Sequence, residues 1–473
     1  MKELNWTQSI CPVCKKPIKG VYRQEGDKVF FVKECSEHGE YKALVANKAE
    51  DYINWTKSAV INIPPKRPLT KGAKTDEECP LHCGTCENHL QTACCVIIDI
   101  TNRCNQHCPY CFARAEMDTM DPGEPTLAEL EEKFDFLVEL GEERPFNIQL
   151  SGGEPTVRDD LPEIIQMAKA KGFDYIQINS NGRRIAQESG YGEILQQAGA
   201  SVIFMQFDGT NDDIYLKLRG ESLLEEKKQA IDNCKKAGLP VALVPMVVRD
   251  VNLDNVGEMM KFLLKNLSVV KGIHFQPVSF FGRYPGEETP REDHGRVTMF
   301  DVLHALEDQF PEFHYKDFAP IVTGHTLCCF YTTYLKEGDK LTCMVTGKQK
   351  EEGVSCCDSG ACGSVDPLEI IEKDRDYVVN KWAIAEDAGC DCDNNDQDLG
   401  CCENEDKSDQ PMDLDQFLKY YKNNTFTVTG MAFQDSINLD AERLKRCRVQ
   451  VLSQDNRLIP FCGYNSIYRG DNK

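Results

Sequence analysis

The segment TNRCNQHCPYCFARA, residues 101–115, holds three cysteines, Cys104, Cys108 and Cys111, in the spacing C-x3-C-x2-C. It directly follows the apolar run VIIDIT (96–101), which predicts a buried strand. Cysteine thiolates hold iron–sulfur clusters, and a 4Fe-4S cluster has four irons. Three thiolates would therefore leave one iron open to a ligand from outside the protein. A structural iron or zinc site is the alternative that this spacing alone leaves open.

Short apolar runs alternate with amphipathic segments after this loop. The helix candidates end near glycine and are LAELEEKFDFLVELG (127–141), LPEIIQMAKAKG (161–172) and SLLEEKKQAIDNCKKAG (222–238). The further strand candidates are FNIQLS (146–151), YIQINS (175–180), SVIFMQFD (201–208), PVALVPMVV (240–248) and IHFQPVS (273–279). Six strands alternating with helices predict an α/β fold with a parallel sheet over 96–285, either doubly wound or curled into a partial barrel.

Polar or glycine-rich segments end three of these strands. The residues that we single out there are Gly152, Gly153 and Glu154 in SGGEP, Asn179, Ser180 and Asn181 in NSNG, and Gln206 and Asp208 in QFDG. Ligand sites of parallel α/β folds lie at the carboxyl ends of the strands, so we expect these segments to share one rim with the cysteine loop. Each segment alone is equally typical of an ordinary turn.

The chain contains 24 cysteines, grouped in short spacings, and its first residues lack the apolar core of an export signal. Metal ligation is therefore favoured over disulfides. Residues 1–60 read as a small module in which Cys11, Cys14, Cys35 and His38 have the spacing of a zinc ribbon. Structural zinc and a rubredoxin-like mononuclear iron are equally favoured there.

A second metal segment is expected over residues 75–95. Cys79, Cys83, Cys86 and Cys94 could hold an auxiliary 4Fe-4S cluster with no open iron, and zinc is the alternative. Residues 286–473 form a C-terminal extension in which Cys329, Cys447 and Cys462, together with Cys328 and Cys343, could converge on a second auxiliary cluster. Buried thiols without a metal are the alternative for these residues, and packing is the expectation for Cys234.

The charge and the apolar content of the chain limit the classes of partner that it could bind. The net charge of -23 and the pI near 4.9 argue against nucleic acid, because phosphate binding needs a basic surface. No stretch approaches the roughly 20 apolar residues of a membrane-spanning helix, although peripheral membrane contact is compatible with the sequence. We expect a cytoplasmic protein from an anaerobic host. The segment near 350–410 is acidic and poor in large apolar residues, which predicts a loop or disorder.

The cysteine loop, with Phe112 after its third cysteine, and the three strand-end segments resemble the radical S-adenosylmethionine (radical SAM) superfamily. The resemblance implies a partial (βα)6 barrel. It also implies that Gly152, Gly153 and Glu154 hold the amino group of S-adenosylmethionine, and that Asn179, Ser180, Asn181, Gln206 and Asp208 surround the remainder. A reductant such as ferredoxin or flavodoxin would supply the electron that splits S-adenosylmethionine into methionine and a 5'-deoxyadenosyl radical.

The order of further motifs resembles one group of that superfamily. These motifs are CPVC…CSEHG, CPLHCGTCENH, LSGGEPTVRDDLPEII, FQPVSFFGR and PFCGYN. The group contains archaeal tetraether lipid synthase and class D radical methylases, which implies a transferase or a carbon–carbon bond-forming enzyme acting on an unactivated carbon of a lipid or another small molecule. The segment GHTLCCF departs from the group, because Gly324 and His325 stand where a proline–cysteine pair is expected. A peptide-modifying maturase and a non-catalytic iron–sulfur electron carrier are the alternatives.

Overall fold

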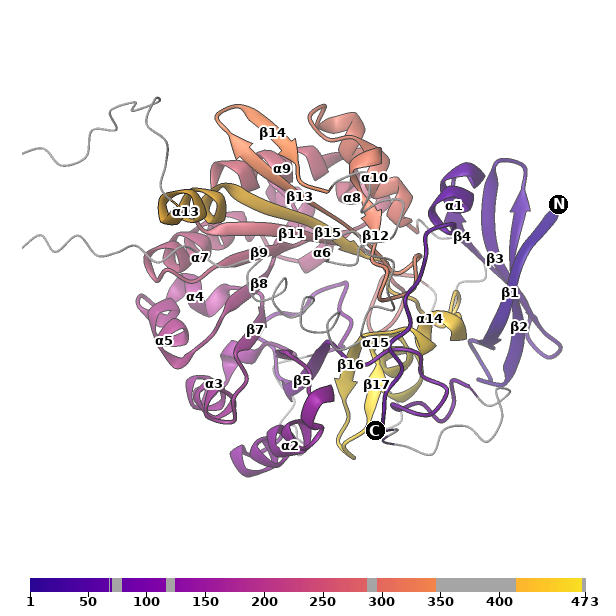
Figure 1. Cartoon of the computed structure of the whole chain (residues 1–473), viewed down its shortest axis with the longest axis horizontal. Helices are drawn as coiled ribbons and strands as arrows, with labels where there is room; N and C mark the ends of the chain where they lie inside the picture. The colour runs from indigo at the N-terminus through magenta and orange to yellow at the C-terminus, as the bar shows by residue number, and fades with distance from the viewer. Residues whose placement is uncertain (68, 70–78, 116–123, 287–295, 346–413, 470–473) are drawn as a thin grey trace, which may run out of the picture.

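The computed structural model describes residues 1–67, 69, 79–115, 124–286, 296–345 and 414–469 (Figure 1). The acidic segment near 350–410 falls outside this part of the chain. So do its seven cysteines, for which metal binding and a dispensable insertion are equally compatible with the sequence, namely Cys356, Cys357, Cys362, Cys390, Cys392, Cys401 and Cys402. In the described residues, no helix is both long and apolar enough to cross a membrane.

The N-terminal module is a four-stranded antiparallel sheet followed by one helix. Its elements are β1 (Lys2–Ile10), β2 (Pro17–Glu25), β3 (Lys28–Cys35), β4 (Gly39–Ala46) and α1 (Ala49–Trp55). Cys11 and Cys14 lie between β1 and β2, and Cys35 ends β3. Because β1 and β3 both pair with β2, the three cysteines come to the same end of the sheet.

Six parallel strands form the centre of the main domain, as the sequence predicts. They are β5 (Cys95–Thr101), β6 (Asn147–Gly152), β7 (Tyr175–Ser180), β8 (Val202–Gln206), β9 (Val241–Val244) and β11 (Val270–Pro277), and each pairs with the next in that order. The short strand β10 (Met246–Val247) also pairs with β11. All six carboxyl ends therefore lie at one edge, which is where the predicted site segments fall.

Helices cover the outer face of these strands (Figure 1). They are α2 (Leu127–Glu139), α3 (Leu161–Ala170), α4 (Arg183–Gln187), α5 (Tyr191–Ala198), α6 (Asp212–Arg219), α7 (Leu224–Lys236), α8 (Arg249–Asn252), α9 (Val256–Lys265) and α10 (Met299–Gln309). Single helical turns occur at Gly141–Glu143, Pro155–Val157, Leu253–Asn255, Tyr315–Asp317 and Tyr464–Tyr468. The start of α2 shows why these helices begin where they do, because Thr126 and Glu129 form a reciprocal capping box.

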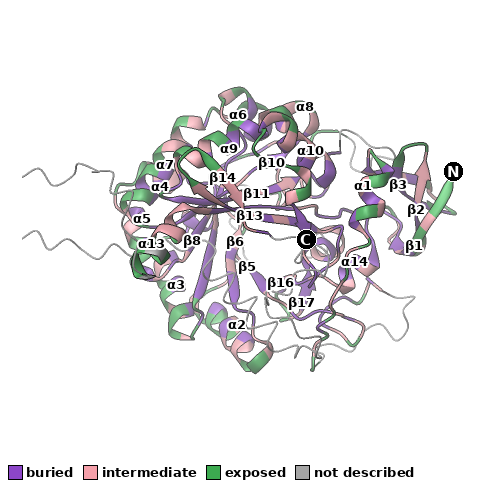
Figure 2. Ribbon diagram, turned by 45° about the horizontal axis from the view of Figure 1, so that its top comes forward, coloured by how far each residue is buried: buried purple, intermediate pink, exposed green. Residues whose placement is uncertain are grey.

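The core lies between the strands and this helical layer. Alternate strand residues such as Ile98, Leu150 and Ile178 pack with helix residues such as Phe134 and Ile164, and all of them are buried. Figure 2 shows the strands as a continuous buried layer, with exposure confined mainly to the outer sides of the helices. The opposite face of each strand is turned to the inside of the barrel.

The C-terminal extension is built into both edges of the main sheet, which the sequence did not reveal. Strand β15 (Thr425–Met431) pairs parallel with β11, while β16 (Val449–Leu452) pairs parallel with β5. Its other strands are β12 (Ala319–Pro320), β13 (Cys329–Glu337), β14 (Lys340–Cys343) and β17 (Leu458–Pro460), and its helices are α13 (Leu414–Asn424), α14 (Ala441–Lys445) and α15 (Phe461–Gly463). The order across the sheet is β12, β13, β15, β11, β9, β8, β7, β6, β5, β16 and β17.

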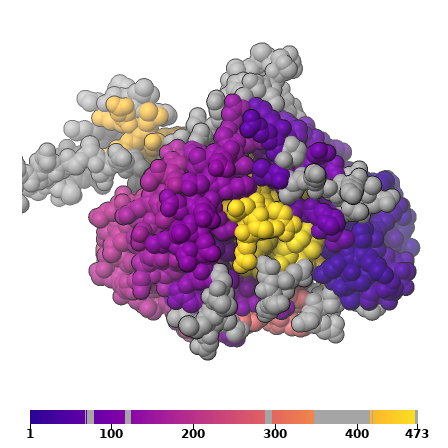
Figure 3. Space-filling view, turned by 90° about the horizontal axis from the view of Figure 1, so that it is seen from below, coloured from indigo at the N-terminus to yellow at the C-terminus, as the bar shows by residue number. Residues whose placement is uncertain are grey.

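The end of the chain also joins the barrel to the N-terminal module. Figure 3 shows residues near the C-terminus between these two parts. Thr7 and Tyr22 each donate a hydrogen bond of 2.6 Å to the carboxylate of Asp440, the N-cap of α14. Buried Lys33 donates to the Ser436 carbonyl at 2.6 Å. The N-terminal metal module is therefore anchored to the segment that leads into Cys447.

Candidate functional site

Two glycines allow the end of β6 to lie directly against the start of the cysteine loop. The amide of Gly153 donates to the Thr101 carbonyl at 2.8 Å, and that of Glu154 donates to the Arg103 carbonyl at 2.9 Å. A Cβ on Gly152 would fall 2.0 Å from the Thr101 oxygen, and one on Gly153 would fall 2.2 Å from the Arg103 oxygen. Only glycine fits at this approach, so the two predicted segments are locked together through their backbones.

Glu154 joins the β6 and β7 ends. Its buried carboxylate accepts hydrogen bonds from the amide of Asn181 at 2.6 Å and from the hydroxyls of Ser180 and Thr156 at 2.8 and 2.6 Å. Asn181 in turn donates to the side chain of Asn105 in the cysteine loop at 2.7 Å. The structure therefore brings three of the four predicted segments together, and Glu154 acts in it as an internal brace.

The three loop cysteines lie in a largely buried setting. Cys104 and Cys108 are buried and Cys111 is half-buried. Burial raises the pKa of Cys104 to about 12, and the nearby Glu154, Cys108 and Cys111 contribute to the rise. Burial likewise raises the pKa of Cys108. These thiols lose their protons readily only when a metal takes the proton's place, as it does in metal-bound thiolates.

Gln106 adds a polar group at the same place. Its oxygen lies 3.6 Å from the sulfur of Cys108, while its buried Nε2 has no hydrogen-bond partner among the described residues. A buried N–H group without a partner is costly unless a ligand accepts a hydrogen bond from it. Three sulfur donors and a spare N–H group beside a glycine cradle fit a 4Fe-4S cluster with one open iron.

Arg283 clamps the cysteine loop from the far side, and the sequence reasoning had assigned it no role. Its backbone exchanges two hydrogen bonds of 2.8 Å with that of Cys111, and its Nε donates to the Cys108 carbonyl at 2.8 Å. Gly282 makes the approach possible with a φ of 73°, because a Cβ there would lie 2.2 Å from the Cys111 oxygen. The available signal was the pair Gly282–Arg283, which follows soon after the last central strand.

A buried charge cluster supports the rim under β8. Arg219 donates to both carboxylate oxygens of Asp208 and also to the Tyr110 carbonyl at 3.1 Å. The Met246 amide donates to Asp208 as well, so this carboxylate is committed to protein groups. Lys227 of α7 donates to the carbonyl of Asn181 and, at 3.2 Å, to Oε1 of Gln206. Of the two predicted β8 residues, Gln206 is thus linked to the rim and Asp208 lies behind it.

The side chain of Asn179 belongs to a row of amides on the inner face of the strands. It donates to the Gln149 oxygen at 3.2 Å and accepts from Gln177 at 2.9 Å. Oε1 of Gln177, another amide oxygen of this row, is buried and has no hydrogen-bond partner among the described residues. The inside of the barrel is polar at this level.

Phe112 points toward an aromatic cluster rather than toward this row. Its ring centroid lies 4.7 Å from that of Phe281 and 6.2 Å from that of Phe433, and Phe433 lies 4.5 Å from Phe461. Phe461 immediately precedes Cys462. These aromatic side chains form an apolar layer between the loop of Cys111 and the C-terminal extension.

The predicted N-terminal ligands converge. One donor atom from each of Cys11, Cys14, Cys35 and His38 lies within 4.8 Å of the others. Cys11 and Cys35 place their sulfurs 3.6 and 3.5 Å from Nδ1 of His38. The Glu37 backbone N–H and the His38 ring lower the pKa of Cys35 to about 6. Three sulfurs and one imidazole around one point suit a tetrahedral metal ion.

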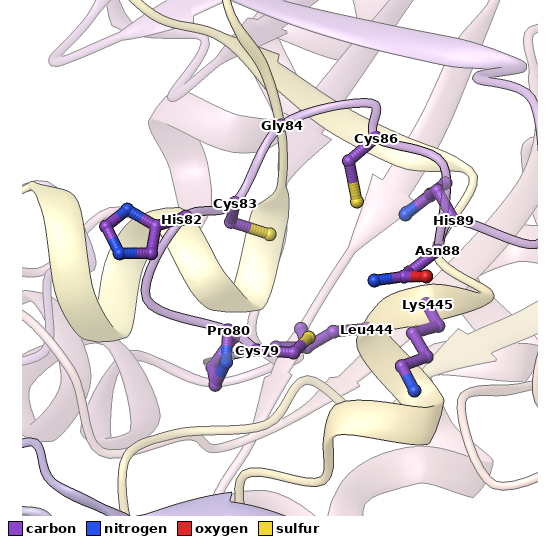
Figure 4. Close-up of a pocket in the computed structure, with 10 residues that line it drawn as sticks. All are labelled: Cys79, Pro80, His82, Cys83, Gly84, Cys86, Asn88, His89, Leu444 and Lys445. Carbon is purple, nitrogen blue, oxygen red and sulfur yellow. The ribbon is translucent and has the colours of Figure 1, made fainter. Parts of the chain in front are cut away.

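The cysteines of residues 79–94 divide between two places. Cys79, Cys83 and Cys86 line one pocket together with His82, His89, Asn88 and Lys445 (Figure 4). Cys94 is not among the lining residues. Its amide donates to the Arg448 carbonyl at 3.0 Å, and its charge contributes to the raised pKa of Cys329. The structure therefore brings together three of these four predicted ligands.

The extension gathers a third set of thiols. Burial raises the pKa of Cys447, and the nearby Cys462 and Cys328 contribute. The sulfur of Cys462 accepts from the Gln434 amide at 3.2 Å, and Arg443 donates to that of Cys328 at 3.4 Å. From the sequence, Cys328, Cys329 and Cys343 were all candidates for this set beside Cys447 and Cys462.

Other thiols lie apart from that set. Burial raises the pKa of Cys329, and both Cys328 and Cys94 contribute to the rise, so Cys329 lies near Cys94 as well as near its chain neighbour. Cys343 contacts the Asp317 carbonyl and Thr332, and Cys234 is buried in the core.

Comparison with known proteins identifies similar sequences for both parts of the chain. The family model of the radical SAM superfamily matches residues 98–263, and that of the HMPTM N-terminal zinc ribbon domain matches residues 4–47. The 7,8-dihydro-6-hydroxymethylpterin dimethyltransferase of Methanocaldococcus jannaschii is 33% identical over 98% of this chain and 94% of its own. A probable GTP 3',8-cyclase of Methanothermobacter thermautotrophicus is 32% identical over 39% of this chain and 58% of its own. Among solved structures, S-adenosylmethionine-bound SuiB of Streptococcus suis matches with a TM-score of 0.37 and 13% identity, covering 49% of this chain and 56% of its own.

Proposed function

The chain belongs to the radical SAM superfamily, and from this premise we propose that it is a radical methyltransferase acting on a carbon of a polar heterocycle of the pterin class. The observation that carries the proposal is the 33% identity to a pterin dimethyltransferase over nearly the whole length of both chains. Membership of this superfamily also sets aside the alternative of a non-catalytic electron carrier.

The rim residues divide into ligands and supports in this proposal. Cys104, Cys108 and Cys111 hold the 4Fe-4S cluster. The half-exposed backbone of Gly152 and Gly153 offers hydrogen-bonding groups to the amino group of S-adenosylmethionine. A further set fixes those edges in place, namely Glu154, Ser180, Asn181, Gln206, Asp208, Arg219, Lys227 and Arg283.

When bound, the cluster supplies the electron that splits S-adenosylmethionine and so starts hydrogen abstraction from the substrate. The chain orients the reacting groups and excludes water. Buried Phe281, Phe433 and Phe461 next to Phe112 close the side of the rim that faces the extension. An adenosyl radical reacts readily with neighbouring groups. An apolar wall that excludes water therefore protects the reaction with the intended substrate from side reactions.

The inner face of the barrel favours a polar heterocycle over an alkyl chain. Gln149 and Gln177 face each other in register on β6 and β7, and Asn179 connects them. The unpaired oxygen of Gln177 could accept an N–H group of a planar ring. A lipid chain would leave the Gln177 oxygen without a partner. A flat ring that carries an N–H group would satisfy it.

The remaining thiol sets support three further parts of the proposal. Cys11, Cys14, Cys35 and His38 hold a structural zinc ion, since their four donor atoms lie within 4.8 Å of one another and the matching family model is a zinc ribbon. Cys79, Cys83 and Cys86 form the core of one auxiliary iron–sulfur cluster. Cys328, Cys447 and Cys462 form that of a second.

The electron donor and the cellular compartment are proposed from the iron–sulfur chemistry and the free thiols. Flavodoxin or ferredoxin supplies the electrons, as suits a low-potential cluster. All 17 cysteines described in the structure are free, which suits the reducing cytoplasm where we place the protein.

The test is anaerobic turnover of the reconstituted protein with S-adenosylmethionine, reductant, a folate-type methylene donor as the source of the added carbon, and either 6-hydroxymethyl-7,8-dihydropterin or an archaeal ether lipid. We expect the pterin to gain the mass of a methyl group. The substitution Gln177→Leu should raise the KM for the pterin at least 10-fold, whereas Gln196→Leu, on the exposed side of α5, should not. Modification of the lipid alone would contradict the proposal.

A further inference from the structure

The pocket of Cys79, Cys83 and Cys86 has three thiols where a closed 4Fe-4S cluster needs four protein ligands. Figure 4 shows the sulfurs of Cys83 and Cys86 turned toward the same space, with Cys79 beneath them. Burial raises the pKa of Cys83, and the neighbouring Cys79 and Cys86 contribute. The three thiols are thus electrostatically coupled and face one cavity.

Cys94 contacts a different part of the molecule. It precedes β5, its amide donates to the Arg448 carbonyl at 3.0 Å, and its sulfur lies 3.6 Å from that same oxygen. Arg448 directly follows Cys447, on the way to β16. Main-chain pairing between the starts of β5 and β16 therefore sets the position of Cys94, outside the lining of the pocket.

His89 lies in the pocket lining three residues after Cys86, which gives the spacing C-x3-C-x2-C-x2-H. Its amide donates to the Cys86 carbonyl at 3.0 Å, so a turn returns the histidine toward the last thiol. The residue is buried, and imidazole is among the commonest metal-binding side chains in proteins.

Both polar contacts that the His89 ring makes with described residues involve Nε2. This nitrogen lies 3.0 Å from the Cys447 carbonyl and 3.1 Å from the side-chain nitrogen of Gln450. The Gln450 nitrogen lies 3.3 Å from the same carbonyl, and the Gln450 oxygen accepts from Thr85 at 3.1 Å. Nδ1, the other ring nitrogen, makes no hydrogen bond with any described residue.

This arrangement is the one in which histidine ligates metals. A metal-bound imidazole donates its second N–H group to a backbone carbonyl or a carboxylate, which fixes the ring. The other histidine of the pocket does not match it, because Figure 4 shows the His82 ring beyond Cys83 and turned away from the three sulfurs. Among the described residues that line the pocket, His89 alone combines a buried imidazole, one ring nitrogen beside a backbone carbonyl and a second ring nitrogen without a hydrogen-bond partner.

We propose that Nδ1 of His89 is the fourth ligand of the auxiliary cluster held by Cys79, Cys83 and Cys86. The inference rests on the auxiliary cluster of the proposed function and replaces Cys94 in its ligand set. An imidazole in place of a thiolate removes one negative charge from the cluster and raises its reduction potential. This cluster then accepts electrons more readily than an all-cysteine cluster at the same place.

The test uses the full chain with Cys104→Ala, Cys108→Ala and Cys111→Ala, which removes the cluster of the rim. The protein is reconstituted with iron and sulfide, reduced, and examined by pulsed electron paramagnetic resonance with and without ¹⁵N-labelled histidine. We expect a directly bound histidine nitrogen to couple to the reduced auxiliary cluster. This coupling should vanish in His89→Cys, which should keep its iron and shift the midpoint potential downward. It should persist in the matched control His82→Ala.

Iron counts on single substitutions separate the ways in which the inference could fail. We expect Cys83→Ala to lose about four irons per chain and Cys94→Ala to lose none. A loss of iron in Cys94→Ala without histidine coupling would show a closed four-thiolate cluster and overturn the inference. Retention of iron in Cys94→Ala without coupling would show an open iron and overturn it as well. Unchanged iron in Cys83→Ala would instead remove the auxiliary cluster itself, which is a failure of the proposed function.

Discussion

Arg219 donates two hydrogen bonds of 2.7 Å to the two carboxylate oxygens of Asp208, and both side chains are buried. The same guanidinium reaches the Tyr110 carbonyl, one residue before Cys111. A single buried ion pair therefore ties the end of β8 to the loop that carries the three cysteines. Planar, two-pronged pairing of this kind needs arginine.

The substitution Arg219→Lys tests this connection. Lysine keeps the charge but lacks the planar guanidinium group. One of the two hydrogen bonds to Asp208 and the hydrogen bond to the Tyr110 carbonyl are therefore lost. Breaking a buried pair costs about 3 kcal/mol or more. We expect a lower free energy of unfolding and less iron at the rim after reconstitution. Arg23→Lys, in the loosely paired surface contact with Glu25, should change neither, and equal effects of the two substitutions would contradict the role of the planar guanidinium group.

The glycine cradle gives a second prediction. Gly153→Ala would place a methyl group 2.2 Å from the Arg103 oxygen, and that oxygen belongs to backbone that cannot move freely. The β6 end and the cysteine loop must then separate. We expect S-adenosylmethionine binding, measured by anaerobic equilibrium dialysis, to weaken at least 10-fold.

Gly324 provides the control for that substitution, because a Cβ there meets no atom within 4 Å. Gly324→Ala should bind the cofactor as the unmodified protein does. Normal binding by Gly153→Ala would show that the close approach is not required.

Lys227 predicts a dependence of stability on pH. Burial lowers the pKa of this amine to about 8 from the ordinary 10.5, although Asp208 opposes the shift. Between these values the unfolded chain binds a proton that the folded chain does not, so stability rises with pH across this interval. Below pH 8 the full cost of the buried charge is present. The interval corresponds to roughly 3 kcal/mol.

Urea unfolding of the protein and of Lys227→Met at several pH values measures this contribution. We expect the stability of the unmodified protein, relative to the variant, to increase as the pH rises from 8 toward 10. Lys228→Met, at an exposed neighbouring position of α7, should show no such trend. A difference for Lys227 that stays constant with pH would place its pKa near the ordinary value.

The N-terminal site predicts one tightly bound metal ion that stabilises its module. The sheet β1–β4 is small, and in such modules metal binding supplies much of the folding free energy. His38→Ala should lower the bound zinc by one ion per chain, as counted by elemental analysis, and lower the melting temperature. Iron in place of zinc in protein purified without added metal would contradict the zinc assignment.

The barrel was readable from the sequence because its signals are local. Runs such as YIQINS coincide with β7 in both ends, and the segments SGGEP and NSNG meet as parallel topology requires. The extension was not readable in the same way. Strands β15 and β16 lie about 150 and 350 residues from their partners β11 and β5, and periodicity carries no information on such pairing.

Roles within the site were harder to predict than its location. Asp208 stands on a rim segment, but its direction depends on Arg219 across a helix. The division between Cys94 and the pocket of Cys83 depends in the same way on the pairing of β5 with β16. Spacing identifies which residues can bind a metal, and tertiary packing decides which of them face the same point.

The central claim is that Cys104, Cys108 and Cys111 hold the cluster at which S-adenosylmethionine is split. The most direct test is the amount of 5'-deoxyadenosine formed by the anaerobically reconstituted protein with S-adenosylmethionine and dithionite. We predict its formation by the unmodified protein and by Cys234→Ala, a change in the core, and its loss by at least 100-fold in Cys108→Ala. Undiminished 5'-deoxyadenosine in Cys108→Ala would contradict the account.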